Sequence, residues 1–123
     1  MTKRSRYSYS DTIAKLTKAV TDGGATIFAT IDQSAAAARV GLTLRPTTLI
    51  VFGNPKGGTP LMEAFPLVAL ELPLKLLVWQ ENDSVSVAFV PMSEIAARYG
   101  ITGMDDRIAA MDRAIDTLTE GIT

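Results

Sequence analysis

Two apolar runs on either side of a short polar turn constrain the fold more than any other feature. Leu74–Gln80 and Ser84–Val90 flank Glu81-Asn-Asp83, an arrangement that predicts a β-hairpin. The later run places an apolar residue at every second position: Val85, Val87 and Phe89. One side of the hairpin should therefore be buried, and the rest of the chain must pack around an antiparallel pair of strands.

The remaining segments alternate between strands and short helices. Strands are predicted over residues 4–9, 26–32 and 47–52, and helices over 35–41, 93–99 and 105–120. A helix that ends before Gly23 is predicted to begin at Ser8, from the spacing of Ser8 to Asp11, with Ser10 as a competing cap. The first helix should bury its apolar side at Ile13, Leu16 and Val20; the last should bury Ile108, Met111, Ile115 and Leu118 and expose Asp112, Arg113 and Asp116. A further helix is expected to begin at Thr59, because a capping residue stands directly before Pro60. This order predicts a single α+β domain over residues 1–123 with a mainly antiparallel sheet.

The composition limits the chemistry. No Cys and no His occur among the 123 residues, which excludes thiolate nucleophiles, imidazole bases and zinc sites built from those ligands. Twelve Lys and Arg against thirteen Asp and Glu give a net charge of -1, which argues against nucleic acid as a partner. No segment has the pattern of a signal peptide or about 18 uninterrupted apolar residues. We therefore expect a cytoplasmic protein with no metal, no cofactor and no membrane contact.

The segment Gly53–Thr59 is the main candidate site. It follows a predicted strand and precedes a predicted helix, where backbone N–H groups can hold an anion and Lys56 adds positive charge. Arg39 and Arg45 flank the same strand and could converge with Lys56 on an anionic ligand. The more common outcome for such residues is a tight turn, in which Asn54 bonds its own backbone, beside solvated surface charges.

Three carboxylates, Asp32, Glu63 and Glu71, lie near this segment in the sequence. Paired carboxylates can hold a hard cation or act as acid and base. Plainer roles compete with that hypothesis: Asp32 as a helix cap, Glu63 in a first helical turn, and Glu71 in an ion pair with Lys75 or Arg45.

Apolar residues on both sides of the central strands point to an interface. Helices packed on one side of the sheet would leave Leu77 and Trp79 facing water. We expect a homodimer that buries these two residues. The alternative is cover from within the chain, by the alanine-rich helix and the helix after Thr59.

Several segments resemble the family known as domain of unknown function 302, which is found in bacteria and archaea. They are Ile31-Asp-Gln, Ala35-Ala-Ala, Gly41-Leu, Leu44-Arg-Pro-Thr47, Phe52-Gly-Asn-Pro55, Gly58-Thr-Pro-Leu-Met62 and Leu72-Pro-Leu-Lys75. The resemblance implies a β-α-β(4)-α fold with helices on one face, similar in topology to half of the TATA-binding-protein saddle. It also implies a tendency to form homodimers, and no established activity. The family often has His where this chain has Gln33, so no role of that His transfers here.

Two classes of function follow from these observations. The first is a dimeric module that binds a small anionic or amphipathic molecule, or a protein. The second is a minor enzyme that uses carboxylates, Lys and backbone amides near Gly53–Thr59. The residues favour the binding module, because no acid and base pair stands at a diagnostic spacing. The candidate ligand-binding residues are Asp32, Arg39, Arg45, Asn54, Lys56, Thr59 and Glu63.

Overall fold

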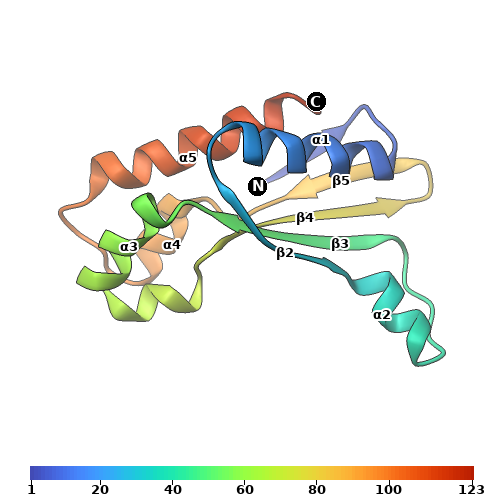
Figure 1. The fold of residues 1–123 in the computed structure, drawn as a ribbon, viewed down its shortest axis with the longest axis horizontal. Coiled ribbons are helices and arrows are strands. Elements are labelled where there is room, and N and C mark those ends of the chain that lie inside the picture. Colours follow the sequence, from blue (N-terminus) through green and yellow to red (C-terminus); the bar gives the residue numbers. More distant parts are fainter.

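A five-stranded antiparallel sheet forms the centre of the computed structural model, which describes residues 1–123 (Figure 1). Its spatial order is β1-β5-β4-β3-β2. The strands are β1 (Thr2–Ser5), β2 (Thr26–Asp32), β3 (Thr47–Gly53), β4 (Leu74–Glu81) and β5 (Ser84–Ala88). The predicted hairpin is confirmed: β4 pairs with β5, and Asn82 in the turn has a φ of 55°.

Two long helices, α1 (Tyr9–Asp22) and α5 (Asp105–Glu120), lie across one face of the sheet (Figure 1). Three short helices, α3 (Pro55–Ala64), the 3₁₀ helix η1 (Pro66–Leu70) and α4 (Met92–Arg98), form a lobe where β3 ends and β4 begins. Helix α2 (Gln33–Arg39) projects away from the opposite end of β3. The predicted α+β class is confirmed. No helix combines the length and the apolar character needed to cross a bilayer.

The hydrophobic core lies between the sheet and the two long helices. Ile50 in β3 and Leu76 in β4 are paired and fully buried, because alternate residues of a strand face the same side. Leu16 of α1 and Ile115 of α5 contribute buried side chains from the helices above. The predicted apolar positions of α1 and α5 therefore do face the sheet.

The other face of the sheet has no helix layer, and we call it the open face. The registers place Leu49, Leu77 and Ala88 in one row across it, and Thr47, Trp79 and Ser86 in the next. These side chains are half-buried by their neighbours. At the β2 edge, Phe28 and Ile31 are 53% and 39% exposed. An apolar surface thus remains uncovered.

Two local predictions were wrong. The first strand ends at Ser5 instead of continuing to Tyr9, because Ser8 accepts the backbone N–H of Asp11 and caps α1, the helix start that the spacing of Ser8 to Asp11 predicted. Asp112, predicted to be exposed, is half-buried and accepts the backbone N–H groups of Met92 and Ser93 at 2.6 and 3.1 Å. Its carboxylate thereby caps the start of α4, which lacks a capping side chain of its own.

Candidate functional site

The segment Gly53–Thr59 is the start of a helix and not a loop. Helix α3 begins at Pro55, and the Asn54 side chain accepts the backbone N–H of Lys56 at 3.0 Å. The predicted start at Thr59 is therefore wrong by one turn. Asn54 and Pro55 carry the same combination of a capping residue and a following Pro, and they come first in the chain. Gly57 and Gly58 lie inside the helix and do not have a positive φ.

Pro60 inside α3 is tolerated because of a contact from α5. Pro60 has no N–H, so the carbonyl of Lys56, four residues earlier, receives no bond from the helix itself. The Arg107 guanidinium donates to that carbonyl at 3.2 Å. This bond links the first turn of α3 to the first turn of α5.

The helical conformation weakens the anion hypothesis for this segment. The backbone N–H of Lys56 is bonded to the Asn54 side chain, and the N–H groups of Gly57 and Gly58 are bonded to the Asn54 carbonyl. Amides that are already bonded cannot cradle a phosphate. The hypothesis therefore rests on the exposed Lys56 ammonium alone.

The candidate ligand-binding residues separate into two groups at opposite ends of β3. Asp32 pairs with Thr48 at the start of the strand, and Arg39 and Arg45 lie at the same end. Asn54, Lys56, Thr59 and Glu63 belong to the beginning and body of α3, after the strand has ended. The three cations therefore do not converge. Glu63 lies next to the end of α3 instead of in a first helical turn.

Asp32 caps α2, as predicted. Its Oδ1 accepts the backbone N–H of Ala35 at 2.9 Å and the Ser34 hydroxyl at 2.7 Å. The hydrogen bond from Ser34, and then the one from Ala35, hold the pKa of the Asp32 carboxyl below its usual value. The Ser34 hydroxyl oxygen in turn accepts the N–H of Thr47 at 3.3 Å, so the cap also ties α2 to the start of β3.

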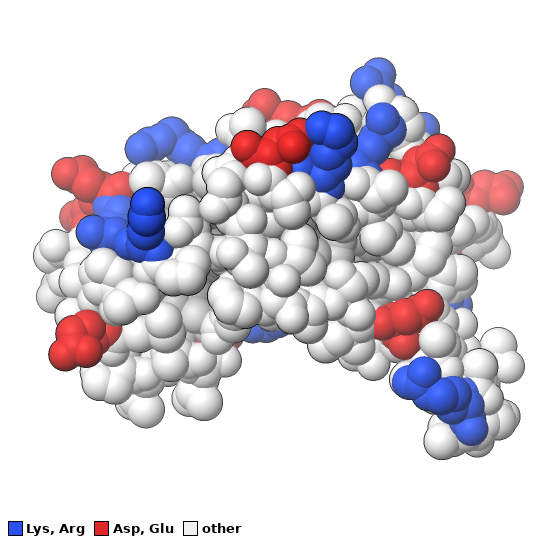
Figure 2. Space-filling model, in the orientation of Figure 1, with Lys and Arg blue, Asp and Glu red and all other residues white.

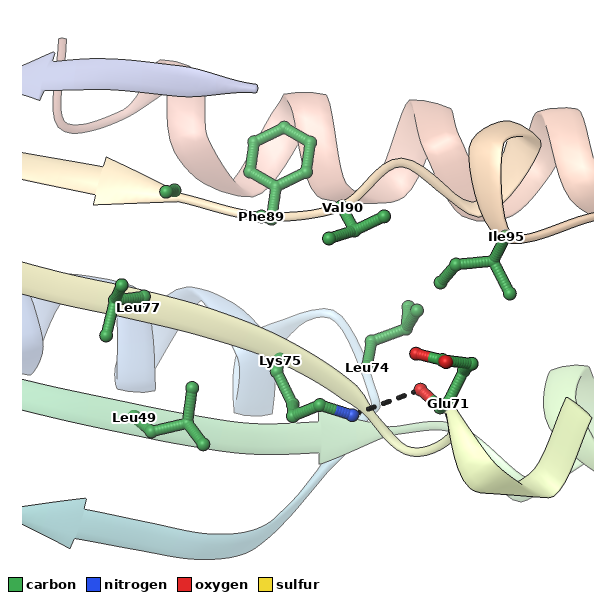
Figure 3. A pocket seen from close by; sticks show the side chains of 9 residues that line it. Leu49, Glu71, Leu74, Lys75, Leu77, Phe89, Val90 and Ile95 are labelled. Atoms are coloured by element: carbon green, nitrogen blue, oxygen red, sulfur yellow. Dashed lines mark hydrogen bonds between the residues drawn. The ribbon is translucent and has the colours of Figure 1, made fainter. Parts of the chain in front are cut away.

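Glu71 has partners other than those predicted. Its carboxylate accepts the Tyr99 hydroxyl at 2.9 Å and lies 3.8 Å from the Arg98 guanidinium. Lys75 instead donates to the backbone carbonyl of Glu71 at 3.2 Å (Figure 3) and to that of Pro73 at 3.3 Å. The hydrogen bond to Glu71 raises the pKa of Tyr99. Glu71 thus joins η1 to α4, and the structure contains no group of three or more carboxylates that could hold a metal ion.

The largest apolar concavity runs between α1 and α5 and reaches the end of β3. We call it the helix groove. Its volume is about 620 Å³, within the range of small-molecule sites. Arg113 is its one charged lining residue, and this guanidinium has no ion-pair partner. The apolar wall includes Val20, Ala25, Phe52, Leu74, Ala110, Met111, Ala114, Ile115 and Leu118.

A smaller cavity of about 220 Å³ adjoins the helix groove. Both are lined by Gly53, Asn54, Leu74 and Met111, so the start of α3 forms the boundary between them. Thr59 lines the smaller cavity, while Lys56 lines neither. Two of the candidate residues, Asn54 and Thr59, therefore do line a cavity. They share it with apolar side chains such as Phe28 and Leu72.

A third concavity, which we call the face pocket, lies on the open face beside the lobe (Figure 3). Its volume is about 320 Å³. Leu49 and Leu77 point into it from β3 and β4, and Val90 and Ile95 line it from the segment after β5 and from α4. Lys75 and Glu71 form its polar end.

Sequence reasoning missed the residues of the helix groove. Arg113 and Met111 were assigned only to the exposed and buried sides of α5. The available signal was the pair of small residues Ala110 and Ala114, about one turn apart on that helix. Small side chains leave space beside a neighbouring helix, but the sequence does not indicate which element borders that space.

Comparisons with known proteins agree with this architecture. A crystal structure of an uncharacterized conserved protein of the same family from Bacillus stearothermophilus superposes with a TM-score of 0.91. It shares 17% identity and covers 100% of this chain and 97% of its own, which establishes the common fold.

Curated relatives from Brucella share more sequence. The proteins named fluoride-specific ion channel FluC 1 of Brucella suis and Brucella abortus are each 33% identical over 122 residues, or 98% of this chain. The chain spans less than half of their length, 48% and 45% respectively. The model of the domain of unknown function DUF302 matches residues 1–118, and the chain belongs to that family.

Proposed function

We propose that this protein is a homodimeric binding module that holds a small amphipathic molecule in the helix groove. The observation that carries the proposal is the groove itself: about 620 Å³ of mainly apolar space between two helices, with one unpaired cation at its wall. Water in such a space gains few hydrogen bonds, so its displacement by an apolar ligand is favourable.

The lining residues favour a ligand with an apolar tail and an anionic head. Phe52 and Leu74 supply apolar contacts from the sheet, and Ile115 supplies them from α5. Arg113 can bind a carboxylate through two parallel N–H groups. A fully charged small molecule fits less well, because no second cation lines the groove.

The homodimer is supported by the open face. Leu77 and Trp79 lie on it and are only half-buried, and helix α2 contains no buried residue that would indicate cover from within the chain. A second copy would remove this apolar surface from water, and a stable interface needs about 800 Å² from each partner.

Blocking the groove tests the ligand half of the proposal. Decanoate should raise the melting temperature of the wild-type protein, and Ala114→Phe, which fills the groove from an exposed position of α5, should abolish that rise. Ala109→Phe is the matched control, because Ala109 is exposed on the same helix and does not line the groove. Equal shifts in both variants would contradict the proposal. No shift in the wild-type protein with any medium-chain carboxylate or alcohol would also contradict it.

The names of the Brucella relatives favour a second candidate, a module that binds fluoride on behalf of a channel. That candidate predicts a higher melting temperature in sodium fluoride than in sodium chloride at the same concentration. Identical melting curves in the two salts would contradict it.

The enzyme alternative gains no support from the geometry. Asp32 and Glu63 lie at opposite ends of β3, and Glu71 is bonded to Tyr99. An acid and a base must face a common substrate position, and these carboxylates do not.

A further inference from the structure

We propose that the smaller cavity beside the helix groove receives the end of the ligand's chain, so that the site selects straight-chain carboxylates by their length. The inference rests on the proposed binding function and specifies which amphipathic molecules the groove takes. It makes Gly58, which lines the smaller cavity and not the groove, the residue that limits the length of the chain.

The boundary between the two spaces has one movable part. Gly53, Asn54, Leu74 and Met111 line both spaces. Gly53 has no side chain, Asn54 is held by its hydrogen bond to the Lys56 N–H, and Leu74 is 9% exposed within β4. Met111 is half-buried, and its unbranched thioether side chain can change rotamer to fit a neighbour. A ligand chain can therefore pass from the groove into the smaller cavity by displacing Met111 alone.

The position of the cation gives the ligand a direction. Arg113 and Met111 are two residues apart on α5, or about 200° around the helix, so they lie at different sides of the groove wall. Arg113 is exposed, whereas Met111 packs against the core near Ile115. The charged side chains in Figure 2 gather over α1 and α5, and the surface below them is almost uncharged. A carboxylate held by Arg113 at the rim would thus direct its chain inward, toward Met111.

The smaller cavity suits the end of such a chain and not its head. None of the residues that line it is charged. A carboxylate inside it would lose its hydration without gaining a counter-charge, which is unfavourable. Phe28, Met62 and Leu72 offer apolar contacts, and each methylene group that leaves water for such a space strengthens binding.

Gly58 keeps the smaller cavity open and can be substituted without strain. It lies inside α3 and does not have a positive φ. An added Cβ would lie 3.7 Å from Cδ1 of Leu72 and 3.8 Å from Cε of Met62, which is ordinary van der Waals contact. Gly58→Leu should therefore fold and fill the cavity. Ala64→Leu is the matched control, because Ala64 is exposed on the same helix and lines neither space.

The methionine methyl groups report on the two spaces separately by NMR. Met111 lines both spaces, Met62 lines the smaller cavity alone, and Met92, which is 1% exposed, lines neither. The wild-type protein is titrated with straight-chain carboxylates from hexanoate to hexadecanoate, below the concentrations at which they form micelles. The Met111 signal should shift with every chain that binds, and the Met62 signal only with the longer chains. The Met92 signal is the internal reference.

Affinities measured by calorimetry test the role of Gly58. Gly58→Leu should bind the longest chains at least about tenfold more weakly than the wild-type protein does, because two or more methylene groups stay in water. The shortest chain that binds the wild-type protein should bind this variant equally well. Ala64→Leu should bind every chain with wild-type affinity.

The outcomes separate this inference from the proposed function. The selection by length is overturned, while binding in the groove stands, if the Met62 signal stays constant up to hexadecanoate or already shifts with the shortest chain that moves the Met111 signal. It is also overturned if Gly58→Leu binds the longest chains with wild-type affinity or weakens all chains equally. A Met111 signal that no carboxylate shifts would overturn the proposed function as well.

Discussion

At the scale of the residue, Asp32 connects local chemistry with the order of helix α2. Its carboxylate is the cap of α2 and, through Ser34, the link to β3. Hydrogen bonds to the charged form lower its pKa in the folded protein. The stabilisation from Asp32 is therefore complete above the pKa of the unfolded chain and is lost as the pH falls through the lower, folded value.

A titration followed by NMR checks this effect. The carboxyl carbon of Asp32 should titrate with a midpoint below 3.8, and the amide signal of Ala35 should change over the same pH interval. Asp32→Asn keeps a capping side chain and has no carboxyl, so its Ala35 signal should lose that pH dependence. A midpoint at or above 3.8 would show that the cap does not form in solution.

At the scale of the element, Asn54 decides where α3 begins. Asn54→Ala removes the hydrogen bond to the Lys56 N–H and should lower the free energy of unfolding by about 1 kcal/mol. For a domain of this size that corresponds to roughly 4 °C in melting temperature. Asn54→Asp should retain most of the stability, because Asp caps equally well.

The same comparison can be made at Thr59. A helix that began there would be destabilised by Thr59→Ala and unaffected by Asn54→Ala. The structure requires the reverse order of effects, which thermal unfolding monitored by circular dichroism would reveal.

Elements with their own local signals were predictable from the sequence. The hairpin was found because two apolar runs flank a polar turn and the second run alternates Val85, Val87 and Phe89, and β2 was found because of its β-branched run. The start of α3 was missed because two Pro residues, each preceded by a capping residue, compete within one segment, and Arg107 resolves the competition from far along the chain.

The site was less predictable than the fold, for a physical reason. The helix groove is bordered by residues at the end of α1 and just after it, at the end of β3 and the start of α3, by Leu74, and by one side of α5. No single segment carries its signature, since the space arises from how α1 and α5 lie on the sheet. The open face, in contrast, was predictable at Leu77 and Trp79, because a strand that is apolar on both sides has more apolar surface than one helix layer can cover.

At the scale of the whole molecule, the single Trp of the chain reports on association. Trp79 lies on the open face, half-buried in the isolated chain. Dimerisation through that face should move its fluorescence emission to shorter wavelength as the protein concentration rises, and should reduce quenching by acrylamide. An emission maximum that stays constant while sedimentation shows dimer formation would place the interface elsewhere.

Native mass spectrometry of freshly purified protein tests the central proposal most directly, because one spectrum reports both association and bound ligand. The proposed function predicts a species of two 13.2 kDa chains with the added mass of an amphipathic molecule, lost when Ala114→Phe fills the groove. A single chain with no added mass, in the presence of medium-chain carboxylates, would contradict both the homodimer and the binding function.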